Sequence, residues 1–507
     1  MHPAIARQLG RTTIEHFTSW TWPGYLWGWH HRVLCKYLDQ LVAGTIKRLM
    51  VFMPPRHGKS ELASRRLPAY FLGRYPDKEV ILTSYAAELA SRMNRDVQRI
   101  IDSFRYNQLF PDTKLYGSGG RSATWNKMRG KRTDSLFEIA GRKGGLRSAG
   151  MRGGITGMGF SLGIIDDPYK NAEEALSITI RDKVEEEYRS SFLTRQAPDA
   201  SILLMGTRWH HDDLFGVMRQ EHPDDWEVLS FPAISEDALD PADERTGPGE
   251  ALWPERFDLD WLEEMRRGVG SFWWSALYRQ DPQLEGGNLF DRRWFGRYRD
   301  GGDAWLIPGS RGVYKDKCTV FASVDPAASE KESADYTAIV VGALTPAQDL
   351  LILDAVKERM TPDKIPKRMI DVARKWDPAF FTFEDNGFQV AVVSAARREK
   401  GMPPIREVSP RGKGKVVRAT PAIIKAEARQ VYVPDPAPDW LENFFDLLER
   451  FRGEDEENDV VDAFADLVRQ CGRLAGEHAD DEAEGVAQRV RMEDRESAAG
   501  RRGLWGR

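Results

Sequence analysis

The first half of the chain alternates short apolar runs with longer segments whose apolar residues recur at helical spacing. The runs predict strands at residues 49–52, 79–85, 160–165 and 201–205. The amphipathic segments predict helices within residues 1–45, at 61–70 and at 87–101. Because strands and helices alternate, this half is expected to form βαβ units, in which a parallel sheet is covered by helices.

The pattern changes from Val313 onward. Three strands with short connections are followed by helix, strand, helix, strand and helix. The strands are expected at 319–325, 335–342, 350–356, 379–384 and 405–408, and the helices at 363–376, at 389–399 and from residue 457. The short connections make the first three strands an antiparallel meander. This is the element order of a ribonuclease H-like fold, whereas residues 290–310 show no clear period.

The length of 507 residues is too large for one core. We place the domains at 1–284 and 313–475, with a linker at 285–312 and a tail at 476–507 that is expected to be disordered. A composition of 41% hydrophobic and 30% charged residues is typical of a globular protein, and a net charge of −5 argues against passive coating of nucleic acid.

Three widely separated cysteines form neither a disulfide framework nor a zinc spacing, which suits a reducing cytosol. No apolar run reaches the roughly 18 residues of a membrane span. The N-terminus lacks the apolar region of a signal peptide.

The stretch Val51–Leu62 has the order of a P-loop: strand, tight turn, Gly58-Lys59-Ser60, helix. In such a loop the backbone N–H groups face a phosphate, the lysine reaches the β- and γ-phosphates, and the serine hydroxyl binds Mg²⁺. Met53 stands where the usual first glycine would be. The alternative is a basic turn with no ligand. The residues expected to bind ATP here are Pro55, Arg56, His57, Gly58, Lys59 and Ser60.

Two further strand ends support the nucleotide site. The strand at 160–165 ends in Asp166-Asp167, an arrangement in which Asp166 holds Mg²⁺ and Asp167 polarises the attacking water. The strand at 201–205 leads to Thr207-Arg208, and Thr207 is a candidate sensor of the γ-phosphate. An Asp-Asp-Pro turn that caps a helix is the structural alternative. Because ligands bind beyond the carboxyl ends of parallel strands, the three strand ends predict one ATP crevice.

The second half carries acidic residues at the ends of expected elements. Asp325 and Glu384 end neighbouring strands, and Asp459 or Asp462 comes from the closing helix. Converging carboxylates need cations to remain ionised, which predicts two Mg²⁺ or Mn²⁺ ions that would hydrolyse a phosphodiester. For each acid alone a helix cap or a solvated surface residue is the favoured interpretation, but three acids at the expected ends of the expected elements reverse that preference.

Three segments leave alternatives open. The aromatic stretch at 25–31 stacks on adenine or packs in the core, and we favour the core. The basic stretches at 112–135 and 411–418 contact DNA phosphates or are solvated loops.

The chain resembles the large terminase subunit of tailed bacteriophages. The motifs that carry the resemblance are PPRHGKSE (54–61), TSYAAELA (83–90), IIDDP (164–168), GTRWH (206–210), LYRQDP (277–282), SVDPA (323–327), FEDNG (383–387) and NDVVDAF (458–464). The resemblance implies an α/β protein with an N-terminal P-loop (RecA/ASCE-like) parallel-sheet ATPase domain plus a C-terminal ribonuclease H-like nuclease domain. It also implies that Arg56 assists hydrolysis. Asp167 stands where Glu is usual, and Asn458 replaces the first residue of a common Asp-Asp pair.

The resemblance further implies a packaging motor that moves double-stranded DNA into a procapsid, with ATP and Mg²⁺ as cofactors, and an endonuclease that cuts concatemeric DNA. The implied partners are the portal protein and the small terminase subunit, with a homo-oligomeric ring during packaging and no membrane. The implied location is the host bacterial cytoplasm and transiently the procapsid, but not the mature virion.

Three other functions compete with the packaging motor. A helicase-nuclease would need a second RecA-like domain, for which residues 215–310 leave too little room. A transposase or integrase would leave the predicted ATP crevice unused. An inactive prophage scaffold protein would keep the fold without turnover.

Overall fold

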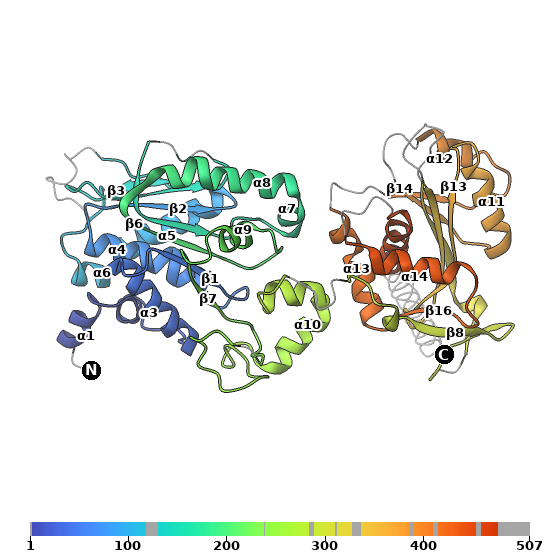
Figure 1. Ribbon diagram of the computed structural model, residues 1–507, viewed down its shortest axis with the longest axis horizontal. Coiled ribbons are helices and arrows are strands. Elements are labelled where there is room, and N and C mark those ends of the chain that lie inside the picture. Colours follow the sequence, from blue (N-terminus) through green and yellow to red (C-terminus); the bar gives the residue numbers. More distant parts are fainter. Residues whose placement is uncertain are drawn as a thin grey trace, which may run out of the picture. The chain divides into compact units, whose positions relative to one another are not determined.

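The structure is a computed structural model. It describes residues 3–117, 130–153, 155, 157–237, 239–282, 288–309, 312–326, 336–384, 390–408, 414–452 and 458–474. The chain forms two compact units, Met1–Leu284 and Glu285–Arg507, each with its own sheet (Figure 1).

The first unit is built on a seven-stranded sheet with the order β3-β4-β2-β5-β6-β1-β7. The pairs from β4 to β7 are parallel, and β3 alone runs antiparallel to its neighbour β4. The strands are β1 (Arg48–Phe52), β2 (Glu79–Ser84), β3 (Leu136–Glu138), β4 (Gly145–Gly150), β5 (Phe160–Asp166), β6 (Gln196–Gly206) and β7 (Glu227–Ser230). The carboxyl ends of β1, β5 and β6 therefore meet at one edge of the sheet.

Both faces of this sheet are covered by helices. Successive residues of a strand point to opposite faces, so Leu49 and Val51 join one apolar cluster while Met50 and Phe52 join another. Helices α3 and α8 lie on opposite sides of the sheet in Figure 1. The first cluster includes residues of α2 (Ile14–Thr21), α3 (Trp29–Ala43), α4 (Leu67–Arg74), α5 (Ala87–Asp102) and α6 (Phe104–Leu109), and the second includes residues of α7 (Ala172–Leu176), α8 (Ile178–Glu187) and α9 (Leu214–Glu221). Helix α1 (Pro3–Leu9) contacts α2 and α6.

Several elements of the first unit differ from expectation, among them β3 and β7, for which no strand was expected. The helix expected at 61–70 begins as a π-helix, η1 (Glu61–Arg66), and continues as α4. Strand β4 lies in a glycine-rich stretch whose period is weak, because Gly145 and Gly150 carry no side chain to signal a buried face. The unit ends with α10 (Leu259–Trp273) and η5 (Trp274–Tyr278).

The second unit contains a nine-stranded sheet with the order β10-β9-β8-β16-β13-β12-β11-β14-β15. Strands β11, β12 and β13 form the expected antiparallel meander, and β14 pairs parallel with β11. This confirms the ribonuclease H-like fold. The strands are β8 (Gly296–Asp300), β9 (Ala304–Leu306), β10 (Val313–Tyr314), β11 (Thr319–Asp325), β12 (Tyr336–Leu344), β13 (Leu350–Arg359), β14 (Phe381–Glu384), β15 (Ile405–Val408) and β16 (Val431–Pro434).

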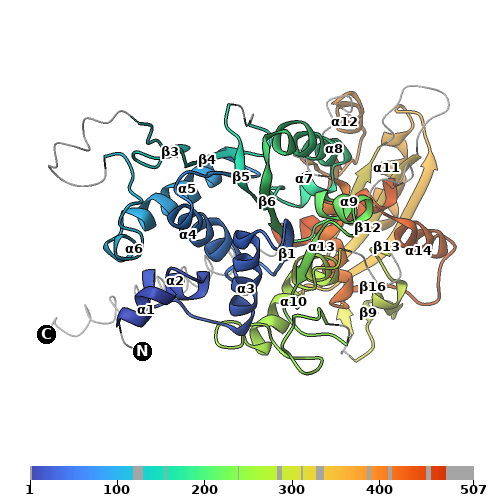
Figure 2. The same cartoon turned by 60° about the vertical axis from the view of Figure 1, so that its left-hand side comes forward.

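The expected linker at 285–312 needs a correction. Its C-terminal part forms β8 and β9, which extend the second sheet through the parallel pairing of β8 with β16. In β8 only Tyr298 is buried, so the strand carries almost no apolar period. The helices of the second unit are α11 (Ile365–Trp376), α12 (Val390–Ala396), α13 (Lys415–Glu427), α14 (Trp440–Arg450) and a closing helix at 459–474 (Figure 2).

Several expectations lie outside the described residues. They concern the tail at 476–507, residues 411–413 of the basic stretch and residues 118–129 of the other basic segment. No helix in the described part of the chain is long and apolar enough to cross a membrane.

Candidate functional sites

The P-loop segment forms a turn whose backbone requires left-handed residues at two positions. Gly58 has a φ of 92° and Arg56 a φ of 66°. Left-handed residues in such a turn direct successive N–H groups toward a common point, which is a concavity suited to an anion. Met53 is fully buried and is not among the residues with positive φ, so glycine is not required at that position. This explains the departure from the usual P-loop pattern.

Two buried imidazoles of α3 hold the turn. The Nδ1 atom of His31 accepts a hydrogen bond of 2.9 Å from the Gly28 N–H, so its Nε2 carries the proton and donates to the His57 carbonyl at 2.9 Å. The Nε2 atom of His30 lies 3.3 Å from the same carbonyl. Because the C=O and N–H of a trans peptide point in opposite directions, this contact turns the Gly58 N–H away from α3.

The space behind Gly58 is closed by the same histidine. A Cβ atom built on Gly58 would meet the His31 Nε2 atom at 2.2 Å. Burial lowers the pKa of His31 from 6.5 to about 4, so the ring is neutral at pH 7. Sequence reasoning treated the segment at 25–31 as core, and Tyr25, Trp27 and Trp29 do pack against the first apolar cluster.

The lysine and serine after the turn reach the end of β5. Lys59, 5% exposed, places its Nζ 3.5 Å from the Asp167 carboxylate and donates to the Met53 carbonyl at 3.4 Å. The Ser60 hydroxyl donates to Asp166 at 3.2 Å. Burial, followed by the neighbouring Asp167 charge, raises the pKa of Asp166 to about 6.

Asp167 connects this site to two other strands. Its carboxylate accepts a hydrogen bond of 3.2 Å from the Thr207 N–H, and its carbonyl accepts one of 2.9 Å from the Tyr85 N–H. The backbone of Asp167 adopts the left-handed conformation, with a φ of 51°. The three expected strand ends therefore meet. The side chain of Arg208 does not join them, because it pairs with the buried carboxylate of Asp213 at 3.1 Å.

One contact of this site was missed from the sequence. The Ser64 hydroxyl donates to Asp166 at 2.7 Å. Ser64 lies four residues after Ser60, and this spacing on a helix could have indicated a shared face. Arg56, by contrast, is exposed on the turn.

The acidic residues of the second unit also gather. Asp325 ends β11 and Glu384 ends β14, and these strands pair in parallel through Val324 and Phe383. Burial, then the charges of Asp462, Glu384, Asp459 and Asp466, raise the pKa of Asp325 well above its ordinary value. The other expected acids thus all act on Asp325, and so does Asp466, which was missed from the sequence.

An arginine of α13 lies among these acids. The Arg418 guanidinium contacts Glu384 at 2.7 Å through Nη1 and Asp462 at 2.9 Å through Nη2. Phosphate contact and a solvated loop were the two expectations for the stretch 411–418, and Arg418 fits neither, since it lies on α13 with its side chain 9% exposed and paired with carboxylates.

The donor set fits hard divalent cations. Carboxylate oxygens are the ligands that Mg²⁺ and Mn²⁺ prefer, and buried acids without enough counter-charge favour cation binding. Among the described residues, three donor atoms within 4.8 Å of one another occur only at His210, His211 and Asp212. There, however, the His210 Nδ1 atom already accepts a hydrogen bond of 3.1 Å from the Asp212 N–H.

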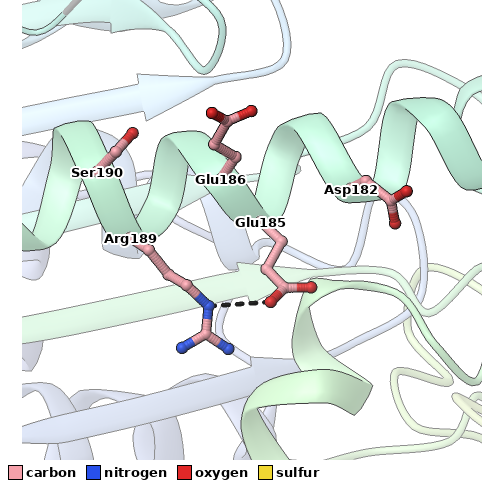
Figure 3. A pocket seen from close by; sticks show the side chains of 5 residues that line it. All are labelled: Asp182, Glu185, Glu186, Arg189 and Ser190. Carbon is pink, nitrogen blue, oxygen red and sulfur yellow. Dashed lines mark hydrogen bonds and ion pairs between the residues drawn. The ribbon is translucent and has the colours of Figure 1, made fainter.

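A surface hollow of about 580 Å³ lies along α8 and η3 (Tyr188–Phe192) in the first unit (Figure 3). Its acidic side chains include Glu185, which pairs with Arg189 at 2.9 Å. This hollow contains none of the expected site residues.

Two family models match the chain. The model described as "Terminase large subunit, T4likevirus-type, N-terminal" matches residues 50–297, and the model described as "Terminase RNaseH-like domain" matches residues 322–473. No curated protein matches the chain.

The chain is similar to several solved structures of large terminases. A large terminase from a thermophilic bacteriophage has a TM-score of 0.44 at 11% identity, covering 86% of this chain and 98% of that chain. The ATPase domain of a large terminase from a Thermus phage has a TM-score of 0.30 at 15% identity, covering 47% and 89%. The large terminase nuclease from thermophilic phage G20c with bound magnesium has a TM-score of 0.26 at 16% identity, covering 35% and 92%.

The family assignment rests on the two family models, which together span most of the chain in the order of the two units. The chain belongs to the large terminase subunit family.

Proposed function

We propose that this chain is the motor subunit that packages viral double-stranded DNA, with ATP hydrolysis in the first unit and metal-dependent cutting of concatemeric DNA in the second. The observation that carries the proposal is the meeting of Lys59 and Ser60 with Asp166 and Asp167 at the end of a parallel sheet. The acidic cluster of the second unit supplies the separate hydrolytic site.

In the first site each side chain has a role that follows from its contacts. Lys59 forms an ion pair with Asp167. Its ammonium group would neutralise the β- and γ-phosphates of bound ATP. Ser60 and Asp166 would hold Mg²⁺, which supplies charge neutralisation between the phosphates. Asp167 would orient the attacking water.

Thr207 is positioned to report on the state of this site. Its backbone N–H binds the same Asp167 carboxylate that faces Lys59. A shift of Asp167 on loss of the γ-phosphate would therefore move the loop after β6. Arg56 is exposed at the turn and would assist hydrolysis by stabilising negative charge on the transferred phosphoryl group.

In the second site Asp325, Glu384 and Asp462 would hold two divalent ions, which supply an activated water and stabilise the leaving 3′-oxygen. We favour Asp462 over Asp459 as a ligand, because the guanidinium of Arg418 contacts both Asp462 and Glu384 and so places these two carboxylates at one point. Asp466 and Asp459 add negative potential around these ligands.

We further propose that the chain acts as a homo-oligomeric ring with the portal protein and the small terminase subunit, in the host cytoplasm and transiently on the procapsid. The basis for these partners is the family to which the chain belongs.

The test combines purified protein, portal-bearing procapsids, linear double-stranded DNA and ATP. Packaging predicts DNA-stimulated ATP turnover and the appearance of DNA that resists added nuclease. A helicase-nuclease would instead separate strands without procapsids, and an inactive scaffold protein would show no turnover. Either result would reject the motor proposal.

A further inference from the structure

Arg418 is buried between two carboxylates that come from different elements of the second unit. Its Nη1 contacts Glu384 at the end of β14, and its Nη2 contacts Asp462 of the closing helix, at 2.7 and 2.9 Å. All three side chains are less than 10% exposed (9% for Arg418, 7% for Glu384 and 7% for Asp462). Its Nε is buried without a hydrogen-bond partner in the described part of the chain.

Negative charge exceeds positive charge around this arginine. Asp325 ends β11, which pairs with the strand that ends in Glu384, and Asp459 and Asp466 lie on the same closing helix as Asp462. Arg469 pairs with Asp466 at 2.5 Å, and the charge of Lys415 also acts on Asp462, whereas Arg418 directly contacts both Glu384 and Asp462. Buried like charges repel unless a cation lies between them.

The guanidinium also keeps the two carboxylates apart. It stands between the Oε1 atom of Glu384 and the Oδ1 atom of Asp462. In the described residues the acids of this site do not bring three donor oxygens within 4.8 Å of one another. A divalent cation needs several oxygens on one center.

We infer that Arg418 is a positioning residue that holds Glu384 and Asp462, and that its guanidinium competes with divalent cations for these two carboxylates. This inference rests on the proposed nuclease function. The two oxygens that Arg418 contacts, Oε1 of Glu384 and Oδ1 of Asp462, become available to a metal only when the guanidinium leaves them.

The experiment measures thermal unfolding of the full-length chain across a Mn²⁺ titration that starts from EDTA. The variants are Arg418→Gln, Arg418→Lys and the control Arg368→Gln, which removes an exposed pair with Glu358 at 2.8 Å in the same unit. Asp325→Asn reports whether the metal response comes from this acidic site.

Arg418→Gln is expected to lower the unfolding temperature in EDTA, because two buried carboxylates lose their cation. It is also expected to reach half of the Mn²⁺ effect at a concentration about tenfold lower than the wild type, because a competitor is gone. Arg418→Lys should keep most of the stability in EDTA and shift the midpoint in the same direction by less. Arg368→Gln should follow the wild type.

Two results would overturn the inference. If Arg418→Gln lowers the unfolding temperature by the same amount in EDTA and in saturating Mn²⁺, the arginine stabilises the fold and does not compete with the metal. An unchanged or higher Mn²⁺ midpoint would mean that Arg418 does not compete. If Arg418→Gln does not fold, the midpoint of Arg418→Lys decides in the same way.

Failure of the nuclease proposal has a different signature. In that case the wild type and Asp325→Asn would respond identically to Mn²⁺, whatever the behaviour of the Arg418 variants.

Discussion

The Ser60 hydroxyl donates a hydrogen bond of 3.2 Å to the Asp166 carboxylate, joining two residues that lie 106 positions apart. Ser60 follows the turn after β1, and Asp166 ends β5, so the contact reaches across the end of β6. Neighbouring Lys59 and Asp167 form a second link of the same kind at 3.5 Å. These two contacts hold the phosphate-binding turn next to the acidic end of β5.

Lys59→Ala should lower ATP turnover by at least about 100-fold, because it removes the buried cation that faces the phosphates. Metal-dependent cutting of plasmid DNA should persist. Both activities are measured on the same preparation. Lys78→Ala is the control, since Lys78 forms a more exposed pair with Asp199 at 2.8 Å. Loss of both activities in Lys59→Ala would argue against two independent sites.

Asp325→Ala should have the converse effect, with plasmid cutting reduced by at least about 100-fold and ATP turnover retained. The raised pKa of Asp325 means that its ionised form is disfavoured in the folded chain. Asp325→Asn should therefore raise the unfolding temperature in EDTA while it removes cutting. Intact cutting by either variant would remove the nuclease assignment.

Met53→Gly would restore the usual P-loop glycine, yet it should destabilise the first unit by about 2–5 kcal/mol, because it deletes a fully buried side chain. ATP binding should remain, since Met53 needs no left-handed backbone.

Gly58→Ala is the matched change at the other end of the turn. Its Cβ would lie 2.2 Å from the His31 Nε2 atom, so we expect ATP binding to be lost. Equilibrium binding of a fluorescent nucleotide and chemical unfolding measure both effects. Tight binding by Gly58→Ala would show that the turn is not fixed by His31.

Arg56→Gly separates the guanidinium from the backbone. Glycine adopts the φ of 66° without strain, whereas alanine would keep a cost of about 1–2 kcal/mol. If Arg56 assists hydrolysis, Arg56→Gly should lower kcat with little change in the Kd for ATP. An unchanged kcat would exclude that role.

His31→Gln should make the first unit less sensitive to acid. The pKa of His31 is about 4 in the folded chain and 6.5 ordinarily, so the unfolded chain binds more protons between these values. The wild type therefore loses up to about 3 kcal/mol of stability from this group as pH falls from 6.5 to 4. Glutamine keeps a donor for the His57 carbonyl but does not titrate.

Chemical unfolding at several pH values measures this slope. The control His222→Gln changes a half-exposed ring and should leave the slope nearly as in the wild type. Equal slopes for His31→Gln and the wild type would contradict a buried neutral imidazole.

The sequence predicted most of the elements that carry chemistry, because they combine strong apolar runs with abrupt polar ends. The strand expected at 319–325 is β11 itself, and the helix expected at 363–376 begins at Ile365 as α11. Strand β16 was missed because it combines four residues with a terminal proline, Pro434, and α13 because Pro421 lies inside it. Short length and an internal proline both weaken a periodic signal.

The sequence predicted those site residues that lie at the ends of strands. The sequence places Asp325 and Glu384 at strand ends, but it gives no direction for the side chain of Arg418, which reaches a partner 34 positions away. The contacts of His30 and His31 with the His57 carbonyl likewise depend on how α3 packs. No local sequence pattern predicts that packing.

The described strands at the edges of both sheets are short. They are β3 and β7 in the first unit, with 3 and 4 residues, and β10 and β15 in the second, with 2 and 4 residues. Such edges offer few unpaired backbone groups to a neighbouring molecule. Crowded copies of this chain are therefore poorly equipped to join their sheets edge to edge, which protects the folded chain from one common route to aggregation.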